Sequence, residues 1–218
     1  MNDPNWNQTK DGAIFSAFPI AMGFYTLPVD NYKILNYMEN LDYNKSMGSA
    51  TPDADIHISK NTKVLKDLPE LERIFAEKVN FYIKEVYEWM IDFQFTKSWV
   101  TKAYPGGYSQ PHYHANSLLS GIYYPFGNEG FKIMFKSPSP VISFWDMSDI
   151  NFPSSSIYSA KEITFDTSDN LLIIFPSYLR HRVMPNNSKE TRYSLAFNIF
   201  PKGKISNDDT EITIGEVY

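Results

Sequence analysis

Residues 118–135 read LLSGIYYPFGNEGFKIMF, with an apolar run at each end and a turn between the runs. Leucine, isoleucine, tyrosine and phenylalanine dominate both runs, and Gly127-Asn-Glu-Gly130 separates them. Short runs of such residues, bounded by glycine and asparagine, are typical of antiparallel strands. The stretch therefore predicts two neighbouring strands, at residues 118–124 and 131–135.

Strands of the same kind are predicted on both sides of this stretch. They lie at residues 93–104, 141–145, 162–165, 171–175 and 192–200. Aromatic residues favour strands, and the 218 residues include 16 Phe, 15 Tyr and 4 Trp. Many short strands after a more helical start indicate an α+β chain that is mainly β. The expected architecture is a jelly roll or a sandwich flanked by N-terminal helices.

The N-terminal part of the chain has the apolar spacing of helices. Apolar residues recur every three or four positions over residues 68–90, with Asp67 and Glu70 placed as a capping box. Residues 28–41 have a similar spacing, which predicts a second helix. The polar stretch 42–63 is predicted to be a long loop that could act as a lid.

No stretch of the sequence has the composition of a linker, which predicts a single domain over residues 1–218. We expect a loose N-terminus at residues 1–12 and helical support from residues 28–90. The barrel core is expected at about residues 93–201.

Composition and charge exclude several classes of protein. With 43% apolar and 21% charged residues, the chain is not expected to be disordered. The formal net charge of −5 and the lack of a Lys/Arg block argue against nucleic-acid or membrane-surface partners. No apolar run approaches the ~20 residues of a membrane-spanning helix. Cysteine is absent, which excludes disulfides and cysteine metal sites, and a cytoplasmic location is expected.

Three of the four histidines form a candidate metal site. His112 and His114 are separated by one residue, so in an extended chain both rings point to one face, ~6.5 Å apart along the strand. His181, which follows an apolar run, could supply a third ligand. Imidazole suits iron, zinc, copper and nickel, and a three-ligand face leaves positions open for substrate or oxygen. Solvated histidines on an edge strand would give the same pattern.

The strand predicted at residues 192–200 brings polar residues to one of its faces. Arg192, Ser194 and Asn198 share this face with Ala196, because side chains alternate along a strand. An arginine inside a barrel is costly unless it is paired, and the strand contains no acidic residue. A bound carboxylate could pair with Arg192, with Ser194 assisting, so the polar residues of this face are candidate cofactor-binding residues. The alternative is that this face is exposed and Arg192 is solvated.

These segments together resemble a known family. The run Gln110-Pro-His112-Tyr-His114, followed by Ser120-Gly-Ile-Tyr-Tyr124, is similar to the 2-oxoglutarate- and iron(II)-dependent oxygenases. The closest likeness is to a set of small oxygenases related to the prolyl-hydroxylase-type group, and it extends over about residues 98–201. It implies a double-stranded β-helix, the jelly roll of this family.

The resemblance also implies metal ligands. His112 matches the first metal ligand of the family and His181 the distal one. Most relatives carry Asp or Glu two residues after the first histidine, where this chain has His114. Either His114 is a ligand in place of that carboxylate, which we favour, or it lies outside the coordination sphere and the metal is held by two residues and water.

Co-substrate contacts follow from the same resemblance. Arg192 lies where the family places the basic residue that pairs with the far carboxylate of 2-oxoglutarate, and Ser194 completes the Arg-x-Ser form of the motif. Tyr104 and Tyr124 match tyrosines that contact the co-substrate in the prolyl-hydroxylase group.

The implied activity is that of a non-haem dioxygenase. Iron(II), 2-oxoglutarate and O2 would together hydroxylate a C–H bond of an unidentified small molecule or peptide, with release of succinate and CO2. Two alternatives remain open. One is a cupin-like metal-binding protein or a dioxygenase that uses no 2-oxoglutarate, and the other is an aromatic-rich binding module without enzymatic activity.

Overall fold

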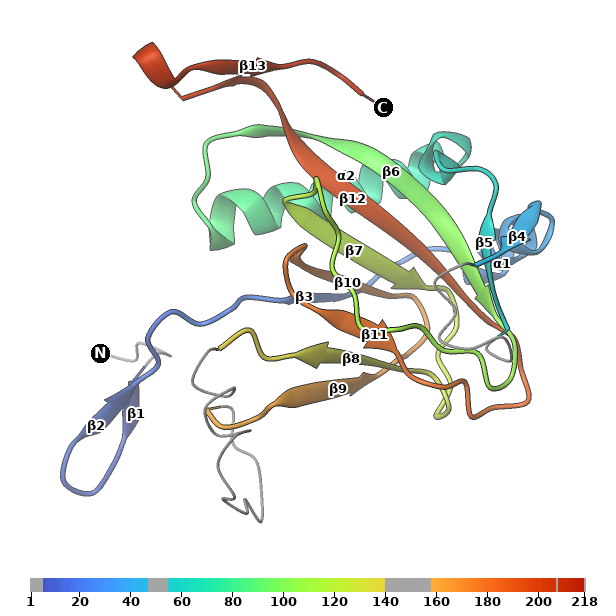
Figure 1. Ribbon diagram of the computed structural model, residues 1–218, viewed down its shortest axis with the longest axis horizontal. Coiled ribbons are helices and arrows are strands. Elements are labelled where there is room, and N and C mark those ends of the chain that lie inside the picture. The colour runs from blue at the N-terminus through green and yellow to red at the C-terminus, as the bar shows by residue number, and fades with distance from the viewer. Residues whose placement is uncertain (1–5, 47–54, 140–157, 207, 218) are drawn as a thin grey trace.

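The computed structural model describes residues 6–46, 55–139, 158–206 and 208–217 (Figure 1). Its larger sheet is antiparallel and runs in the order β3–β10–β7–β12–β6–β5–β4, and β13 pairs with β12. The strands of this sheet are β3 (Gly23–Thr26), β4 (Tyr43–Lys45), β5 (Ile56–Ser59), β6 (Asp92–Ala103), β7 (Leu119–Tyr124), β10 (Leu171–Pro176), β12 (Arg192–Ile205) and β13 (Ile212–Ile214).

A smaller antiparallel sheet faces the larger one. It has the order β11–β8–β9, with bounds His181–Val183, Lys132–Lys136 and Glu162–Asp166. Ile133 and Phe135 of β8 are buried in one cluster with Ile122 and Tyr124 of β7, so apolar side chains fill the space between the two sheets. The predicted mainly β fold, a double-stranded β-helix, is confirmed.

Helices cover the opposite face of the larger sheet. They are α1 (Asn31–Glu39), the 3-10 turn η1 (Val64–Asp67), α2 (Pro69–Phe81) and the π-helical turn η2 (Tyr82–Val86). In Figure 1, α2 lies behind the strands of the larger sheet. Its Phe75 packs against Tyr123 of β7 and Phe197 of β12, with ring centroids 5.6 Å and 5.0 Å away. Within the described ranges, no helix is long and apolar enough to cross a membrane.

The close approach of α2 to the sheet depends on a glycine. Gly121 of β7 lies under the Phe197 ring, and a Cβ at this position would overlap the ring. Because Gly121 has no side chain, the Phe197 ring can lie over β7 and pack against Phe75 of α2.

The helix predicted over residues 68–90 is shorter than expected. It ends at Phe81 and continues only as one π-helical turn, and Met90 is 94% exposed. The predicted capping box is wrong, since no side chain caps the N-terminus of α2. The Asp67 carboxylate instead accepts hydrogen bonds from the Tyr37 hydroxyl (2.7 Å) and the Asn61 amide (2.8 Å), which occupy it.

The expected long loop at residues 42–63 contains strands. β4 and β5 pair with each other, and β5 pairs with β6, so this segment extends the larger sheet. Ser59 is buried, yet its hydroxyl accepts from the Val100 N–H (3.0 Å) and donates to the Asn61 carbonyl (2.6 Å). Hydrogen bonding makes a polar residue acceptable inside the sheet, which is why composition misled the prediction. Residues 47–54 lie outside the described residues.

Most strand predictions are confirmed, but the structure differs from them at several points. The strand predicted at residues 141–145 lies outside the described residues, and β11, at His181–Val183, was not predicted. Within the expected loose start, β1 (Trp6–Gln8) pairs with β2 (Ala13–Phe15) in a hairpin that extends away from both sheets (Figure 1).

Candidate metal centre

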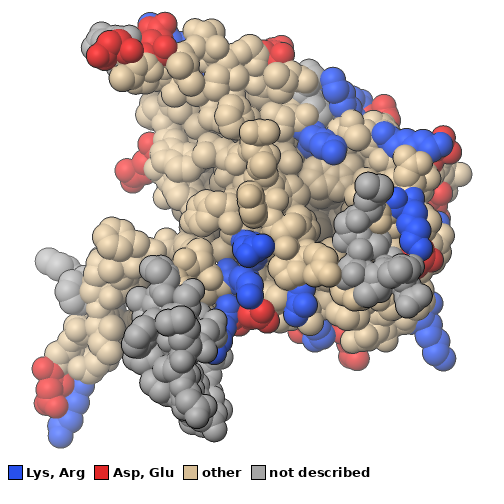
Figure 2. All heavy atoms as spheres, viewed as in Figure 1, with Lys and Arg blue, Asp and Glu red and all other residues tan. Residues whose placement is uncertain are grey.

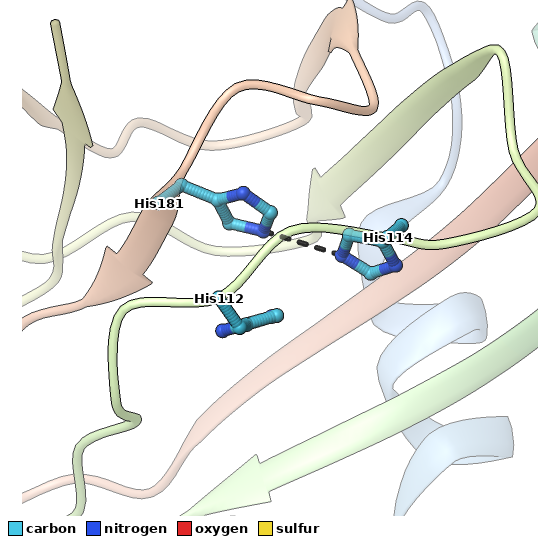
Figure 3. A group of neighbouring side chains, drawn as sticks. All are labelled: His112, His114 and His181. Carbon is cyan, nitrogen blue, oxygen red and sulfur yellow. Dashed lines mark hydrogen bonds between the residues drawn. The ribbon is translucent and has the colours of Figure 1, made fainter. Parts of the chain in front are cut away.

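The structure brings the three candidate histidines together. His112 and His114 lie between β6 and β7, and His181 is the first residue of β11. One ring nitrogen from each residue lies within 4.8 Å of the other two, and the Nε2 atoms of His114 and His181 are 3.3 Å apart (Figure 3). Nitrogens this close can share one cation.

Backbone hydrogen bonds fix the spacing of the three rings. The His112 N–H donates to the His181 carbonyl and the His181 N–H donates to the His112 carbonyl, both at 2.9 Å. The His114 N–H donates to the Ser177 carbonyl at 3.0 Å. The ring centroids of His112 and His114 are 5.3 Å apart, which agrees with two residues on one side of an extended segment.

Two of the rings are oriented by carbonyl groups. The Nδ1 atom of His112 lies 2.8 Å from the Gln110 carbonyl oxygen, and Nδ1 of His181 lies 3.0 Å from that of Leu179. A carbonyl can only accept, so Nδ1 carries the proton in both rings and Nε2 keeps its lone pair. Hydrogen bonds of this kind hold a histidine in the tautomer and orientation that a metal requires.

Burial keeps two of the imidazoles neutral. His181 is only 6% exposed, and burial, followed by the neighbouring His112, lowers its pKa to about 3. The pKa of His114 falls to about 4, chiefly through burial and then through the positive charges of His112 and Lys97. Metal binding requires neutral imidazole, so these side chains are ready to bind at pH 7 without releasing protons. Three imidazole nitrogens form a donor set that iron(II) accepts.

Aromatic side chains surround the histidines, and we did not predict this from the sequence. Trp99 of β6 lies 5.5 Å from His114 between ring centroids, and Phe175 and Phe135 lie 4.7 Å and 5.7 Å from His181. The strand alternation offered a signal for Trp99. It pairs in register with Ala196 and therefore shares the inner face of the larger sheet with Arg192.

Arg192 is buried without an acidic partner. Its residue surface is 2% exposed, and the guanidinium donates to the carbonyls of Met184 (3.1 Å) and Gly107 (3.4 Å). The group also lies 5.8 Å from the centre of the Phe131 ring. No Asp or Glu of the described residues forms an ion pair with it. Its charge is therefore solvated only by carbonyls and a ring face.

The hydroxyl of Tyr124 is buried near this guanidinium and has no hydrogen-bond partner among the described residues. Burial raises the pKa of Tyr124 to about 12, although the positive charge of Arg192 acts in the opposite direction. An unsatisfied buried hydroxyl is rare in proteins and costs ~1–3 kcal/mol. A carboxylate would accept from the hydroxyl and neutralise the guanidinium, so this pocket fits one end of a dicarboxylate.

Ser194 and Asn198, the other candidate cofactor-binding residues of β12, lie at different distances from Arg192. Ser194 is buried and pairs in register with Thr101, on the same face of β12 as Arg192. Asn198 lies six residues further along β12, ~20 Å from Arg192, and its amide oxygen accepts from Ser120 at 3.0 Å. One small carboxylate cannot contact both Arg192 and Asn198.

Tyr104 is not brought to the Arg192 pocket. Its ring lies next to that of His57, at 5.6 Å between centroids, and the Lys102 ammonium lies 4.9 Å from its centre. Lys102 pairs in register with Tyr193, whose side chain alternates with Arg192 to the opposite face of the sheet. A role for Tyr104 in co-substrate binding gains no support from this position.

Part of the chain matches the model of a known protein family. Residues 97–198 match the model of a family described as "Putative 2OG-Fe(II) oxygenase". This segment includes the three histidines, Arg192 and Tyr124. The match covers slightly less than half of the chain, and it confirms the resemblance to 2-oxoglutarate- and iron(II)-dependent oxygenases seen in the sequence. No curated protein matches the chain.

Solved structures share the fold at low sequence identity. A prolyl hydroxylase from Trichoplax adhaerens, in complex with a hypoxia inducible factor peptide fragment, has a TM-score of 0.57 at 13% identity, covering 82% of this chain and 83% of that one. A Pseudomonas putida prolyl-4-hydroxylase has a TM-score of 0.53 at 13% identity, with coverages of 84% and 94%. The epimerase SnoN, solved with Fe3+ and alpha ketoglutarate, has a TM-score of 0.61 at 9% identity, with coverages of 90% and 82%.

Proposed function

We propose that the protein is a non-haem iron(II)- and 2-oxoglutarate-dependent dioxygenase that hydroxylates a C–H bond of a small molecule or peptide. The proposal depends on one observation: two features occur together in the interior of the barrel. One is the cluster of His112, His114 and His181, and the other is the buried Arg192 with the unsatisfied Tyr124 hydroxyl. The first fits a divalent metal and the second fits the far carboxylate of a dicarboxylate.

Each side chain has a distinct task in this proposal. His112, His114 and His181 hold the metal through Nε2, with two of the rings oriented by the Gln110 and Leu179 carbonyls. When bound, iron(II) and 2-oxoglutarate supply the oxidative chemistry with O2, and succinate and CO2 are released. Phe135 and Phe175 make the surroundings of His181 apolar, which keeps water away from the metal ligands.

Arg192, Tyr124 and Ser194 have the task of fixing the co-substrate. The guanidinium binds one end of 2-oxoglutarate and the Tyr124 hydroxyl donates to it, so the keto acid end is directed toward the histidines. Binding would therefore neutralise Arg192 and satisfy the Tyr124 hydroxyl at the same time. Both groups would become better solvated than they are in the protein alone.

The two alternative functions explain fewer of the buried polar groups in the barrel. A cupin-like protein or a dioxygenase without 2-oxoglutarate would use the histidines but would leave Arg192 and Tyr124 without a ligand. A binding module without enzymatic activity would explain neither group. Hydroxylation is the finer part of the proposal, since relatives of similar fold include an epimerase. The single domain and the cytoplasmic location stay predictions.

The test is turnover of 2-oxoglutarate by the purified protein. With iron(II) and O2, we expect slow conversion of 2-oxoglutarate to succinate even without substrate, and none from the His181→Ala variant. Calorimetric binding of 2-oxoglutarate to the manganese(II) protein should weaken at least about tenfold in Arg192→Met. Unchanged affinity in that variant would favour the cupin-like alternative. A wild-type protein that binds no metal would contradict the proposal itself.

A further inference from the structure

We propose that the substrate of this centre carries an anionic oxygen group, a carboxylate or a phosphate monoester, that binds Lys97 and Asn198 at the histidine end of the barrel. This inference rests on the proposed function, because it describes what enters the same site. It starts from the inner face of the larger sheet, where Lys97 of β6 and Asn198 of β12 are directly paired in register. Directly paired residues of an antiparallel sheet project to the same face.

Lys97 is held close to the histidines by an aromatic ring. Its ammonium lies 5.3 Å from the centre of the Trp99 ring, and the Trp99 ring lies 5.5 Å from that of His114. Lys97 and Trp99 are two residues apart on one strand, so both point to the same side. The cation–π contact limits where the flexible lysine can go.

Lys97 is exposed and forms no ion pair with an acidic residue in the part of the chain that the structure describes. Asn198 is half-buried, and its amide oxygen accepts from Ser120 at 3.0 Å. This leaves the NH2 group of Asn198 as a donor on the same face of the sheet as Lys97, on the neighbouring strand. An ammonium and an amide N–H that share one face are suited to bind an anionic oxygen between them.

The charges of the site favour the same kind of ligand. Three imidazole ligands contribute no negative charge, unlike a site with one Asp or Glu ligand. The two negative charges of 2-oxoglutarate would not balance a divalent metal, Arg192 and Lys97 together, so the site would stay positive, and of the two side chains Lys97 is the one without a carboxylate partner. A substrate anion would compensate the exposed one of the two, Lys97, and would be attracted into the site by the positive potential.

The surface around the barrel is compatible with an anionic ligand. Although the chain has a net charge of −5, Figure 2 shows Lys and Arg side chains in the middle of this face, near β8 and β11. Many of the Asp and Glu side chains in this view lie toward the periphery of the molecule. Acidic groups therefore do not dominate the approach to this part of the barrel in this view.

The experiment measures binding near the metal and does not use activity. The full-length protein is loaded with manganese(II) and saturating 2-oxoglutarate, and the probes are phenylacetate, phenyl phosphate and the neutral phenylacetamide. Manganese(II) broadens the proton NMR signals of a probe that binds close to it. We expect the signals of the two anions to broaden and those of the amide to change little. The anion whose signals broaden more identifies the preferred oxygen group.

Variants of Lys97 test whether this side chain binds the anionic probes. In Lys97→Gln the affinity for the anionic probes should fall about tenfold or more, whereas Lys97→Arg and the control Lys204→Gln should stay within about twofold of wild type. Lys204 is an exposed lysine near the end of β12 that pairs with Glu211 (2.6 Å). Thermal unfolding of each variant verifies that it is folded.

Three results would overturn the inference. Broadening that is unchanged in Lys97→Gln would mean that the anions bind the manganese directly. Equal broadening by the amide, or none by either anion, would mean that charge does not select the ligand. In these cases bound manganese and 2-oxoglutarate would leave the proposed function intact. A wild-type protein that retains no manganese would overturn both proposals.

Discussion

His112 and His181 are joined by two backbone hydrogen bonds, one in each direction, although they come from distant parts of the chain. The isolated antiparallel bridge between them sets the separation of two candidate metal ligands through the main chain. Their ring centroids lie 4.5 Å apart. The geometry of the candidate metal centre is therefore fixed by main-chain pairing rather than by long, flexible side chains.

Removing any one of the three histidines should abolish tight metal binding. We expect His112→Ala, His114→Ala and His181→Ala each to lower manganese(II) affinity by more than about 100-fold, because losing only the hydrogen-bond partner of a metal ligand can cost up to about that much. Elemental analysis after dialysis measures this. The matched control is His57→Ala, since His57 lies outside the cluster and pairs with Asp55 at 2.7 Å.

The His114 variant also separates two versions of the site. Full manganese occupancy in His114→Ala would mean that two residues and water hold the metal. His114 would then lie outside the coordination sphere.

Replacing Tyr124 with phenylalanine should separate stability from co-substrate binding. The hydroxyl is buried and has no hydrogen-bond partner in the part of the chain that the structure describes, so Tyr124→Phe is expected to stabilise the protein without ligand by about 1 kcal/mol in urea unfolding. The same change should weaken 2-oxoglutarate binding about three- to tenfold, because one donor to the carboxylate is lost. Destabilisation together with unchanged binding would show that the hydroxyl has a different partner.

The stability of the metal-free protein should fall as the pH drops below about 6.5. Burial lowers the folded-state pKa of His181 to about 3 and of His114 to about 4, both below the unfolded value of ~6.5. Between pH 6.5 and 4 the unfolded chain therefore binds protons that the folded protein does not, and protonation favours unfolding. Each group contributes a slope of up to ~1.4 kcal/mol per pH unit, while stability above pH 6.5 is unaffected by these two residues.

Urea unfolding at pH 7 and pH 5 checks this dependence. His114→Gln should lose about half of the pH sensitivity that the two histidines cause. Equal pH dependence in the wild type and in this variant would contradict the assignment of a buried neutral imidazole to His114.

The fit between helix and sheet should depend on Gly121. Gly121→Ala is expected to lower the free energy of unfolding by about 1–3 kcal/mol, because its methyl group would push against the Phe197 ring. Gly215→Ala is the control, since a Cβ there would meet no atom within 4 Å, and we expect a change below ~0.5 kcal/mol. Similar unfolding midpoints for the two variants would show that Phe197 moves aside freely.

Local rules predicted part of the site from sequence. The one-residue spacing of His112 and His114 predicted adjacent rings, and alternation along residues 192–198 placed Arg192 and Ser194 on a shared face, which the structure shows to be buried. Both conclusions needed only the geometry of an extended chain. The mainly β architecture followed in the same way from short aromatic segments and their turns.

Features that depend on long-range pairing could not be predicted. The position of Tyr104 follows from the end of β6 at Ala103 and from the cross-strand neighbours Lys102 and His57, which no local pattern indicates. β5 is a short strand within a polar stretch, and it is stabilised by pairing with the edge of β6, which lies far along the chain. The orphan hydroxyl of Tyr124 appears only when burial is known, so the fit to a carboxylate could not be tested from sequence.

The measurement that tests the account most directly is a crystal structure of the protein with manganese(II) and N-oxalylglycine. An anomalous difference map from the same crystal locates the metal. We predict one anomalous peak at coordination distance from a nitrogen of each of His112, His114 and His181, with the far carboxylate of N-oxalylglycine on Arg192 and Tyr124. A peak elsewhere, or a carboxylate that contacts neither Arg192 nor Tyr124, would contradict the account.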